Sequence, residues 1–148
     1  YDRDGEEVLV GRYEGKIKET NVTDRMDPSE QSEYKYVLHI DGHVAAYRLG
    51  RELDYNSCIL KMEGYEDYKL WFSDELIPYD EKEGNEDTAN IINVKLEGLM
   101  SQIESIRKNE VISKNVANNA KVLYSRVMTK DYMEVYMKQK LNMISSHF

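Results

Sequence analysis

The sequence predicts an α/β domain in which a parallel sheet is flanked by helices. Two apolar runs enclose a helical pattern between residues 36 and 62. A connection that contains its own helix joins parallel strands through a right-handed crossover rather than a hairpin. A third apolar run and more helical patterns follow, and such alternation is typical of this fold class. The 148 residues suit one domain, so we expect a domain over residues 34–148 and an irregular lead-in, or a remnant of an upstream domain, over residues 1–33.

The first strand is predicted at residues 36–40, where aromatic and β-branched side chains precede an Asp-Gly turn. A short helix is expected over residues 44–53, because its apolar residues recur every four positions. These residues are Ala45, Leu49 and Leu53. Residues 54–56 end that helix, and residues 58–62 are predicted to form a second buried strand.

The middle of the chain is predicted to hold a helix, a loop and a strand. Residues 66–76 can form a helix that ends before Ile77-Pro78 and turns three side chains inward. These are Leu70, Trp71 and Leu76. Residues 80–87 are acidic but lack the ligand spacing of a calcium loop, so we expect a solvated loop rather than a metal site. Residues 91–94 suggest the third strand.

Three helices are predicted in the remaining chain. The first two cover residues 96–106 and 112–127, where apolar residues recur at intervals of three or four. The third begins at Asp131, a good N-cap residue followed by Glu134 three positions later. It is expected to bury one face, formed by Met133, Tyr136, Met137, Leu141 and Ile144.

Composition and charge exclude several classes of protein. A net charge of −8 argues against a general nucleic-acid binder, because phosphate neutralisation requires clustered Lys and Arg. Cys58 is the sole cysteine, which excludes an intrachain disulfide and the zinc patterns that use two cysteines. Apolar runs such as residues 91–99 are interrupted by polar residues, so no membrane span is expected. The chain starts at Tyr1 without an apolar leader, which suggests a fragment of a longer protein.

The candidate ligand site lies between the first strand and the first helix, at Asp41-Gly42-His43. Ligands of open parallel sheets bind outside the carboxyl ends of the strands. A helix that begins near His43 or Val44 directs unpaired backbone N–H groups and a partial positive charge at that position, which suits a pyrophosphate. Gly42 permits close backbone approach. His43 is either a hydrogen-bond donor to the ligand or an exposed turn residue without a role.

Arg48 is the side chain expected to contact the anion. Side chains of a helix lean toward its amino terminus, so the guanidinium can reach back and make a forked phosphate contact. The alternative is an ion pair with Glu52, four residues later, on a solvated helix face. Spacing alone leaves both interpretations open. The sequence has neither a G-x-G-x-x-G dinucleotide motif nor a Walker motif.

Five further residues have competing interpretations. Trp71 either belongs to the core or stacks on a nucleotide base. Lys61, at the end of the second strand, faces either the ligand or solvent. Cys58 is expected to be a buried strand residue rather than a nucleophile. His39 and His147 have no predicted partner that indicates catalysis.

A longer stretch of the sequence resembles a known family. Residues 32–49 read SEYKYVLHIDGHVAAYRL and are similar to glycosyltransferase family 90, which includes protein O-glucosyltransferases and fungal capsule xylosyltransferases. The likeness continues through SCILK at residues 57–61 and, weakly, through LWF at 70–72 and LIP at 76–78. The last helices fit in order and length, so the resemblance covers residues 28–142.

The resemblance implies the carboxy-terminal, Rossmann-like half of a two-domain, B-type glycosyltransferase. Such an inverting enzyme transfers a sugar, glucose or xylose here, from a uridine diphosphate (UDP) sugar to a glycan or protein hydroxyl. An upstream domain completes the cleft, and no bound metal or other cofactor is needed for the donor. Arg48 would bind the diphosphate, with help from neighbouring backbone amides. The implied donor-binding residues are Gly42, His43, Val44, Ala45, Ala46, Tyr47, Arg48 and Lys61.

Two departures from the family pattern limit what the resemblance implies. The upstream carboxylate that activates the acceptor is not recognisable, so no general base is assigned. Residues 80–88 form an acidic insertion where the family continues into a strand containing His-Tyr. Family members commonly work in the endoplasmic reticulum or Golgi lumen, whereas a single cysteine slightly favours the cytoplasm and leaves localisation open. The rival interpretation is a non-catalytic module of the same scaffold that binds a protein or glycan.

Overall fold

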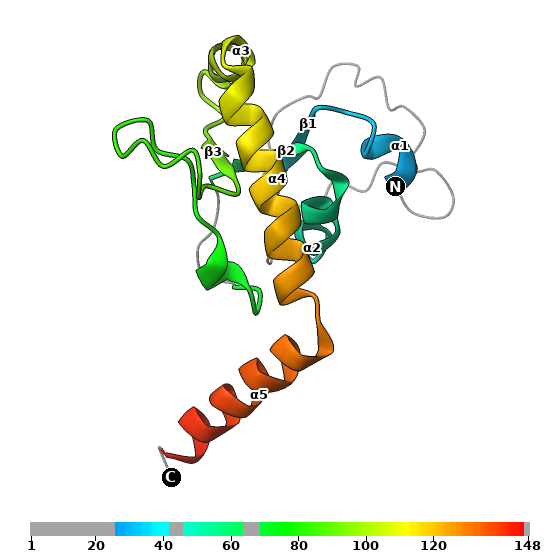
Figure 1. The fold of residues 1–148 in the computed structure, drawn as a ribbon, viewed down its shortest axis with the longest axis vertical. Coiled ribbons are helices and arrows are strands. Elements are labelled where there is room, and N and C mark those ends of the chain that lie inside the picture. The colour runs from blue at the N-terminus through cyan, green and yellow to red at the C-terminus, as the bar shows by residue number, and fades with distance from the viewer. Residues whose placement is uncertain (1–25, 42–45, 64–68, 147–148) are drawn as a thin grey trace, which may run out of the picture.

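The computed structural model describes residues 26–41, 46–63 and 69–146 and shows an α/β fold (Figure 1). The strands are β1 (Tyr36–His39), β2 (Cys58–Met62) and β3 (Ile92–Val94). The helices are α1 (Pro28–Gln31), α2 (Arg48–Glu52), α3 (Leu99–Lys108), α4 (Glu110–Val127) and α5 (Lys130–Ser145). Two short 3-10 helices are η1 (Leu53–Tyr55) and η2 (Ser73–Glu75). No helix in the described ranges is both long enough and apolar enough to span a bilayer.

The three strands form a parallel sheet in the order β1-β2-β3. Tyr36 is paired with Cys58 and Leu60 with Ile92. The predicted strands and their parallel arrangement are therefore confirmed. The carboxyl ends of β1 and β2 meet at one edge, because Cα partners in register run to His39 and Lys61.

The core forms around β2 and α4, and α4 crosses the strands in Figure 1 and contacts β2. Successive residues of a strand point to opposite faces. Accordingly, Ile59 belongs to one buried cluster, with Leu49, Leu53, Phe72 and Leu123 among its members. Cys58 and Leu60 belong to a second cluster with Ile92, Val94 and Val116. Helix α4 contributes to both clusters and so joins them into one structural unit.

Helix α2 is shorter in the described residues than the predicted helix over residues 44–53. It begins at Arg48, and residues 42–45 lie outside the described part of the chain. Leu49 and Leu53 are buried, as their spacing predicts. Asn56 adopts a left-handed conformation with a φ of 60°, which ends the helical segment before β2. The predicted break at residues 54–56 is correct in its effect, although residues 54 and 55 still belong to η1.

The predicted helix over residues 66–76 is wrong in its described part, residues 69–76. This segment contains only the short η2 turn. Leu70 and Phe72 are both buried, and residues 71 and 72 form a turn closed by a 3.0 Å hydrogen bond from the Ser73 backbone N–H to the Leu70 carbonyl. The Ser73 hydroxyl also accepts a 2.8 Å hydrogen bond from the Leu70 backbone N–H, which stabilises a local turn. Trp71 and Leu76 are partly buried against the core, so the inward direction of these side chains is confirmed.

The lead-in and the acidic loop agree only in part with expectation. Residues 1–25 lie outside the described residues, and Pro28–Gln31 forms a helical turn that the predicted irregular lead-in did not include. Asp27 and Glu30 make a reciprocal capping box at its start. Residues 80–87 form turns, as expected of a loop. Asn85 orders them by accepting from the Asp80 backbone N–H at 2.8 Å and donating to the Pro78 carbonyl at 3.0 Å.

The carboxy-terminal helices follow the predicted order, with one error in burial. Helix α3 begins at Leu99 rather than residue 96, after Gly98 with a φ of +75°. Helix α5 is capped by Thr129, whose side chain accepts from the Tyr132 backbone N–H, and not by Asp131. It has no buried residue within the described structure and projects away from the sheet (Figure 1). The predicted burial of its apolar face is therefore wrong, because the described residues supply no surface that covers it.

Candidate functional site

Polar side chains gather at the carboxyl ends of β1 and β2. His39 ends β1 and is the register partner of Lys61 on β2. Asp41 follows β1 by two residues, and Glu52 reaches the same place from the end of α2. Open parallel sheets bind ligands at this edge, so the arrangement is the natural candidate for a functional site.

The side chains form one continuous polar chain. Glu52 Oε2 lies 2.5 Å from His39 Nδ1, and Asp41 Oδ1 lies 3.2 Å from His39 Nε2. Lys61 Nζ lies 3.2 Å from Asp41 Oδ2. Arg48 Nε lies 3.4 Å from Glu52 Oε1 at the other end. The chain thus places three groups that can carry positive charge between and beside two carboxylates.

The middle of this chain is buried. His39 is 0% exposed and Glu52 is 3% exposed, although a glutamate is almost never fully buried unless it is paired. Burying a charged group without a partner is costly, whereas a hydrogen-bonded partner of opposite charge offsets the cost. The contact between His39 Nδ1 and Glu52 Oε2 gives each of these buried groups a hydrogen-bond partner. Removing either one would leave the other buried without its principal partner.

Asp41 links the chain to the backbone in front of α2. Its Oδ1 accepts a 2.9 Å hydrogen bond from the Ala46 backbone N–H, in addition to its contact with His39. Burial acts to raise the pKa of this carboxyl, but the hydrogen bonds from Ala46, His39 and Lys61 outweigh it and hold the pKa below its usual value of 3.8. Asp41 is therefore a carboxylate under ordinary conditions.

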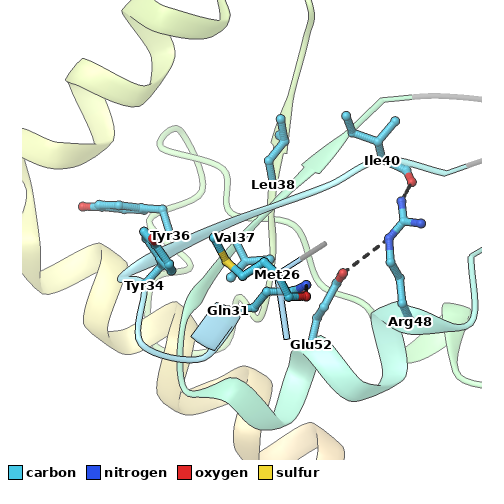
Figure 2. Close-up of a pocket in the computed structure, with 9 residues that line it drawn as sticks. All are labelled: Met26, Gln31, Tyr34, Tyr36, Val37, Leu38, Ile40, Arg48 and Glu52. Carbon is cyan, nitrogen blue, oxygen red and sulfur yellow. Dashed lines mark hydrogen bonds and ion pairs between the residues drawn. The ribbon is translucent and has the colours of Figure 1, made fainter. Parts of the chain in front are cut away.

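Arg48 joins the end of α2 to the end of β1. Its guanidinium donates to the Ile40 carbonyl and pairs with Glu52 (Figure 2). The Arg48 side chain remains 46% exposed. The predicted pair with Glu52 is present, but Glu52 is buried rather than on a solvated face. Contact between Arg48 and an anion stays a prediction. A guanidinium has five N–H donors in a fixed fork, so these two contacts leave donors for a further acceptor.

A pocket of about 410 Å³ opens beside β1 and takes Arg48 as part of its wall (Figure 2). Pockets that hold small molecules have roughly 300–1,000 Å³ and combine apolar walls with a few polar groups. The nine lining residues fit that description: Met26, Gln31, Tyr34, Tyr36, Val37, Leu38, Ile40, Arg48 and Glu52. The pocket therefore reaches the polar chain at its Arg48–Glu52 end.

The structure brings only some of the predicted donor-binding residues to this place. Gly42, His43, Val44 and Ala45 lie outside the described residues, as does His147. The Ala46 N–H is already bonded to Asp41, and Tyr47 is 77% exposed at the start of α2. Lys61 approaches Asp41 and is not among the residues that line the pocket. Arg48 is thus the one predicted residue that the described structure places on the pocket wall.

Sequence reasoning missed His39, Asp41 and Glu52 as a connected unit. One signal was available: Leu49, Glu52 and Leu53 follow the i, i+3, i+4 spacing of a single helix face, and two of them are core leucines. A glutamate on an apolar helix face requires a buried partner. His39 was the matching candidate at the end of the neighbouring strand.

Cys58 and Trp71 have structural roles. Cys58 is buried, and burial raises the pKa of its thiol to about 12, so a nucleophilic thiolate is disfavoured. Trp71 meets Phe72 edge to face, with ring centroids 5.2 Å apart, and its indole N–H donates to the Val127 carbonyl at 3.4 Å. Trp71 therefore belongs to the partly buried margin of the core. Across residues 26–41, 46–63 and 69–146, no group of three or more His, Cys, Asp or Glu side chains is arranged to hold a metal ion.

Two viral proteins are similar to this chain. The chain is 32% identical over 127 residues to the uncharacterized protein 035R of Invertebrate iridescent virus 3, a match that covers 84% of this chain and 11% of that protein. It is 31% identical over 128 residues to the uncharacterized protein 179R of Invertebrate iridescent virus 6, covering 82% of this chain and 10% of that protein. The chain thus spans about a tenth of the length of these curated relatives. No family model matches the sequence.

Proposed function

We propose that this domain binds a UDP-sugar as the donor-binding part of an inverting glycosyltransferase. In this proposal the chain is the Rossmann-like, carboxy-terminal half of a B-type enzyme similar to glycosyltransferase family 90. The sugar, glucose or xylose, passes to a hydroxyl of a glycan or protein. The rest of the enzyme, including its general base, lies outside this chain.

The observation that carries the proposal is an arginine on a pocket wall at the carboxyl ends of parallel strands. Arg48 leaves α2 at that edge, is half exposed, and lines the pocket of about 410 Å³. Guanidinium groups make forked, charge-assisted hydrogen bonds to phosphate oxygens. This position is also where nucleotides bind in open α/β sheets.

The rest of the pocket suits the nucleoside part of the donor. Tyr34, Tyr36 and Val37 supply apolar surface, and the Gln31 side chain supplies an amide with both donors and acceptors. A flat, polar base fits a pocket with this mixture of walls and hydrogen-bonding groups. Uracil in the pocket and the diphosphate at Arg48 would leave the sugar near the end of β1.

The proposed chemical role of Arg48 is to stabilise negative charge on the departing diphosphate. Sugar transfer moves electron density onto the leaving oxygen, and a fixed positive group stabilises that charge more in the transition state than in the donor. The acceptor hydroxyl needs a base from elsewhere. The relatives are about ten times longer than the matched segment, so their remaining length can accommodate a second domain.

Equilibrium titration with UDP tests the proposal. We expect Arg48→Ala to cost about 1.5–3 kcal/mol of binding free energy, as for a hydrogen bond to a charged group. Arg126→Ala is the matched control, because it removes another exposed guanidinium that pairs with a glutamate, Glu75. Uridine without phosphates should bind the wild type and Arg48→Ala equally. Absence of UDP binding at millimolar concentration would contradict the proposal.

One observation favours the rival function, a non-catalytic module that binds a protein or glycan. Large apolar side chains are exposed around the pocket: Met26 is 40%, Leu38 is 39% and Ile40 is 44% exposed. Arg48 also contacts two protein groups, the Ile40 carbonyl and the Glu52 carboxylate. Binding of an oligosaccharide or protein without competition from UDP would favour this alternative.

A further inference from the structure

His39 is enclosed by charged groups from each described element that packs against it. Glu52 approaches Nδ1 from α2, and Asp41 approaches Nε2 from the segment after β1. Lys61, its register partner on β2, lies on the far side of Asp41. Arg48 lies behind Glu52. The imidazole has no exposed surface, so it does not touch a ligand in the pocket.

The two contacts decide how many protons this group of residues must hold. An ionised carboxylate only accepts hydrogen bonds, and a neutral imidazole has one N–H and one acceptor nitrogen. A neutral His39 could therefore donate to Asp41 or Glu52, but not to both. Satisfying both contacts requires one more proton, located either on the second ring nitrogen or on one of the carboxyls.

The neighbours of the carboxyls favour the ring as the location of that proton. Glu52 Oε1 also forms an ion pair with the Arg48 guanidinium at 3.4 Å, so the Glu52 carboxylate faces a group that only donates hydrogen bonds. Asp41 accepts from the Ala46 N–H and faces the Lys61 ammonium at 3.2 Å, contacts that hold the pKa of this carboxyl below its usual value. With both carboxylates ionised, His39 must donate from both nitrogens.

We propose that His39 is a buried imidazolium that links Glu52 to Asp41 and thereby positions Arg48 at the pocket wall. Charge then alternates in sign along the chain Arg48, Glu52, His39, Asp41 and Lys61. The imidazolium holds Glu52 Oε2, which leaves Oε1 directed at Arg48. His39 is a positioning residue, because it acts on a ligand only through Glu52 and Arg48. What Arg48 binds rests on the proposed function, whereas the proton on His39 and the orientation of Arg48 do not.

Nitrogen NMR of the histidine rings tests the first half of this proposal. In the full chain at neutral pH, we expect His39 to show two protonated ring nitrogens, the signature of an imidazolium. The chain has two other histidines, His43 and His147, so the signals can be assigned with H43Q and H147Q. A neutral pattern for His39, with Nδ1 as the acceptor of a proton held by Glu52, would overturn the proposal.

The Arg48 side-chain N–H signal tests the positioning half. We expect H39Q to move the Nε–H resonance of Arg48 to that of a solvent-exposed arginine, since Glu52 loses the partner that orients it. The Arg126 signal should stay in place, because its partner Glu75 is remote from His39 in the hydrogen-bond network. An unchanged Arg48 signal in folded H39Q would overturn the proposal. If H39Q does not fold, the Arg48 Nε–H resonance of the wild type decides the positioning half, and a resonance at the position of a solvent-exposed arginine would overturn it. Neither the ring signals nor the Arg48 signal depends on UDP binding.

Discussion

Two glutamates of this protein have the same local arrangement but different surroundings. Glu52 pairs with Arg48 and Glu134 pairs with Lys130, in each case across four residues of a helix. The Glu52 side chain is 3% exposed and also contacts His39, whereas the Glu134 side chain is 51% exposed. The first pair belongs to the polar chain at the end of the sheet, and the second lies on the projecting helix α5.

This difference shows that helical spacing brings the two charges together, whereas burial determines how much the ion pair matters for the stability of the fold. An exposed pair exchanges its partner for water at little cost. A buried carboxylate has no such replacement, so its partners must be retained. The same contrast separates α4, which has six buried residues, from α5, which has none in the described structure.

Replacing the two glutamates should give the largest difference. We expect Glu52→Ala to lower the free energy of unfolding by about 3–5 kcal/mol, because His39 and Arg48 lose their buried carboxylate. Glu134→Ala should change it by about 0.5 kcal/mol or less. Urea denaturation of both variants measures the two values. Equal changes in the free energy of unfolding would show that burial does not make the Arg48–Glu52 pair more stabilising than the Lys130–Glu134 pair.

The same comparison can be made between leucines of α4 and α5. Leu123 is 3% exposed in the core, so Leu123→Ala should cost about 2–5 kcal/mol through lost burial and a residual cavity. Leu141 is 59% exposed, so Leu141→Ala should stay within about 0.5 kcal/mol. Thermal and chemical denaturation supply the measurement. A large cost at Leu141 in the isolated chain would mean that α5 packs against a surface.

Acid should weaken the linked polar side chains at the end of the sheet, because Asp41 becomes protonated. Its folded pKa is lowered, so its contribution to stability is complete above the usual value of 3.8 and is lost as the pH falls through the lower folded value. Asp41→Asn removes that contribution and should make stability less dependent on pH in this acidic range. Denaturation midpoints of the wild type and Asp41→Asn, followed from neutral pH downward, provide the test. Parallel curves would contradict the assigned role of Asp41.

The smallest expected effect is the rate at which Cys58 reacts with iodoacetamide in the native chain. Its pKa is raised to about 12 by burial, and little thiolate or accessible sulfur exists in the folded protein near neutral pH. Labelling should be far slower in the native chain than in urea. Comparable rates in the two conditions would show that β2 is open to solvent.

Local patterns predicted most of the sheet correctly. The runs that became β1 and β2 are short, apolar and bounded by turn residues, so burial and strand geometry favour the same conformation. Their parallel pairing followed from the helix between them. In contrast, Leu70 and Phe72 are two positions apart, and a pattern of helical appearance around them gave the wrong conformation. Tertiary contacts, rather than the local sequence pattern, determine the conformation of that segment.

The functional site and α5 were harder to predict, because both depend on contacts between distant elements. The Arg48–Glu52 spacing was visible, and the position of Glu52 beside core leucines indicated a buried partner. Only the fold brings His39, thirteen residues before Glu52, into contact with it. The apolar face of α5 was also visible, with Met137 56% and Ile144 57% exposed in the structure. Periodicity identifies such a face without saying what covers it.

Mapping UDP on the backbone amides tests the central claim most directly. We expect UDP to shift the amide resonances of residues near Arg48 and the pocket, including Tyr34 and Val37, while those of α5 stay unchanged. Arg48→Ala should remove the shifts at the same UDP concentration. Shifts confined to another surface, or no shifts at millimolar UDP, would contradict the account.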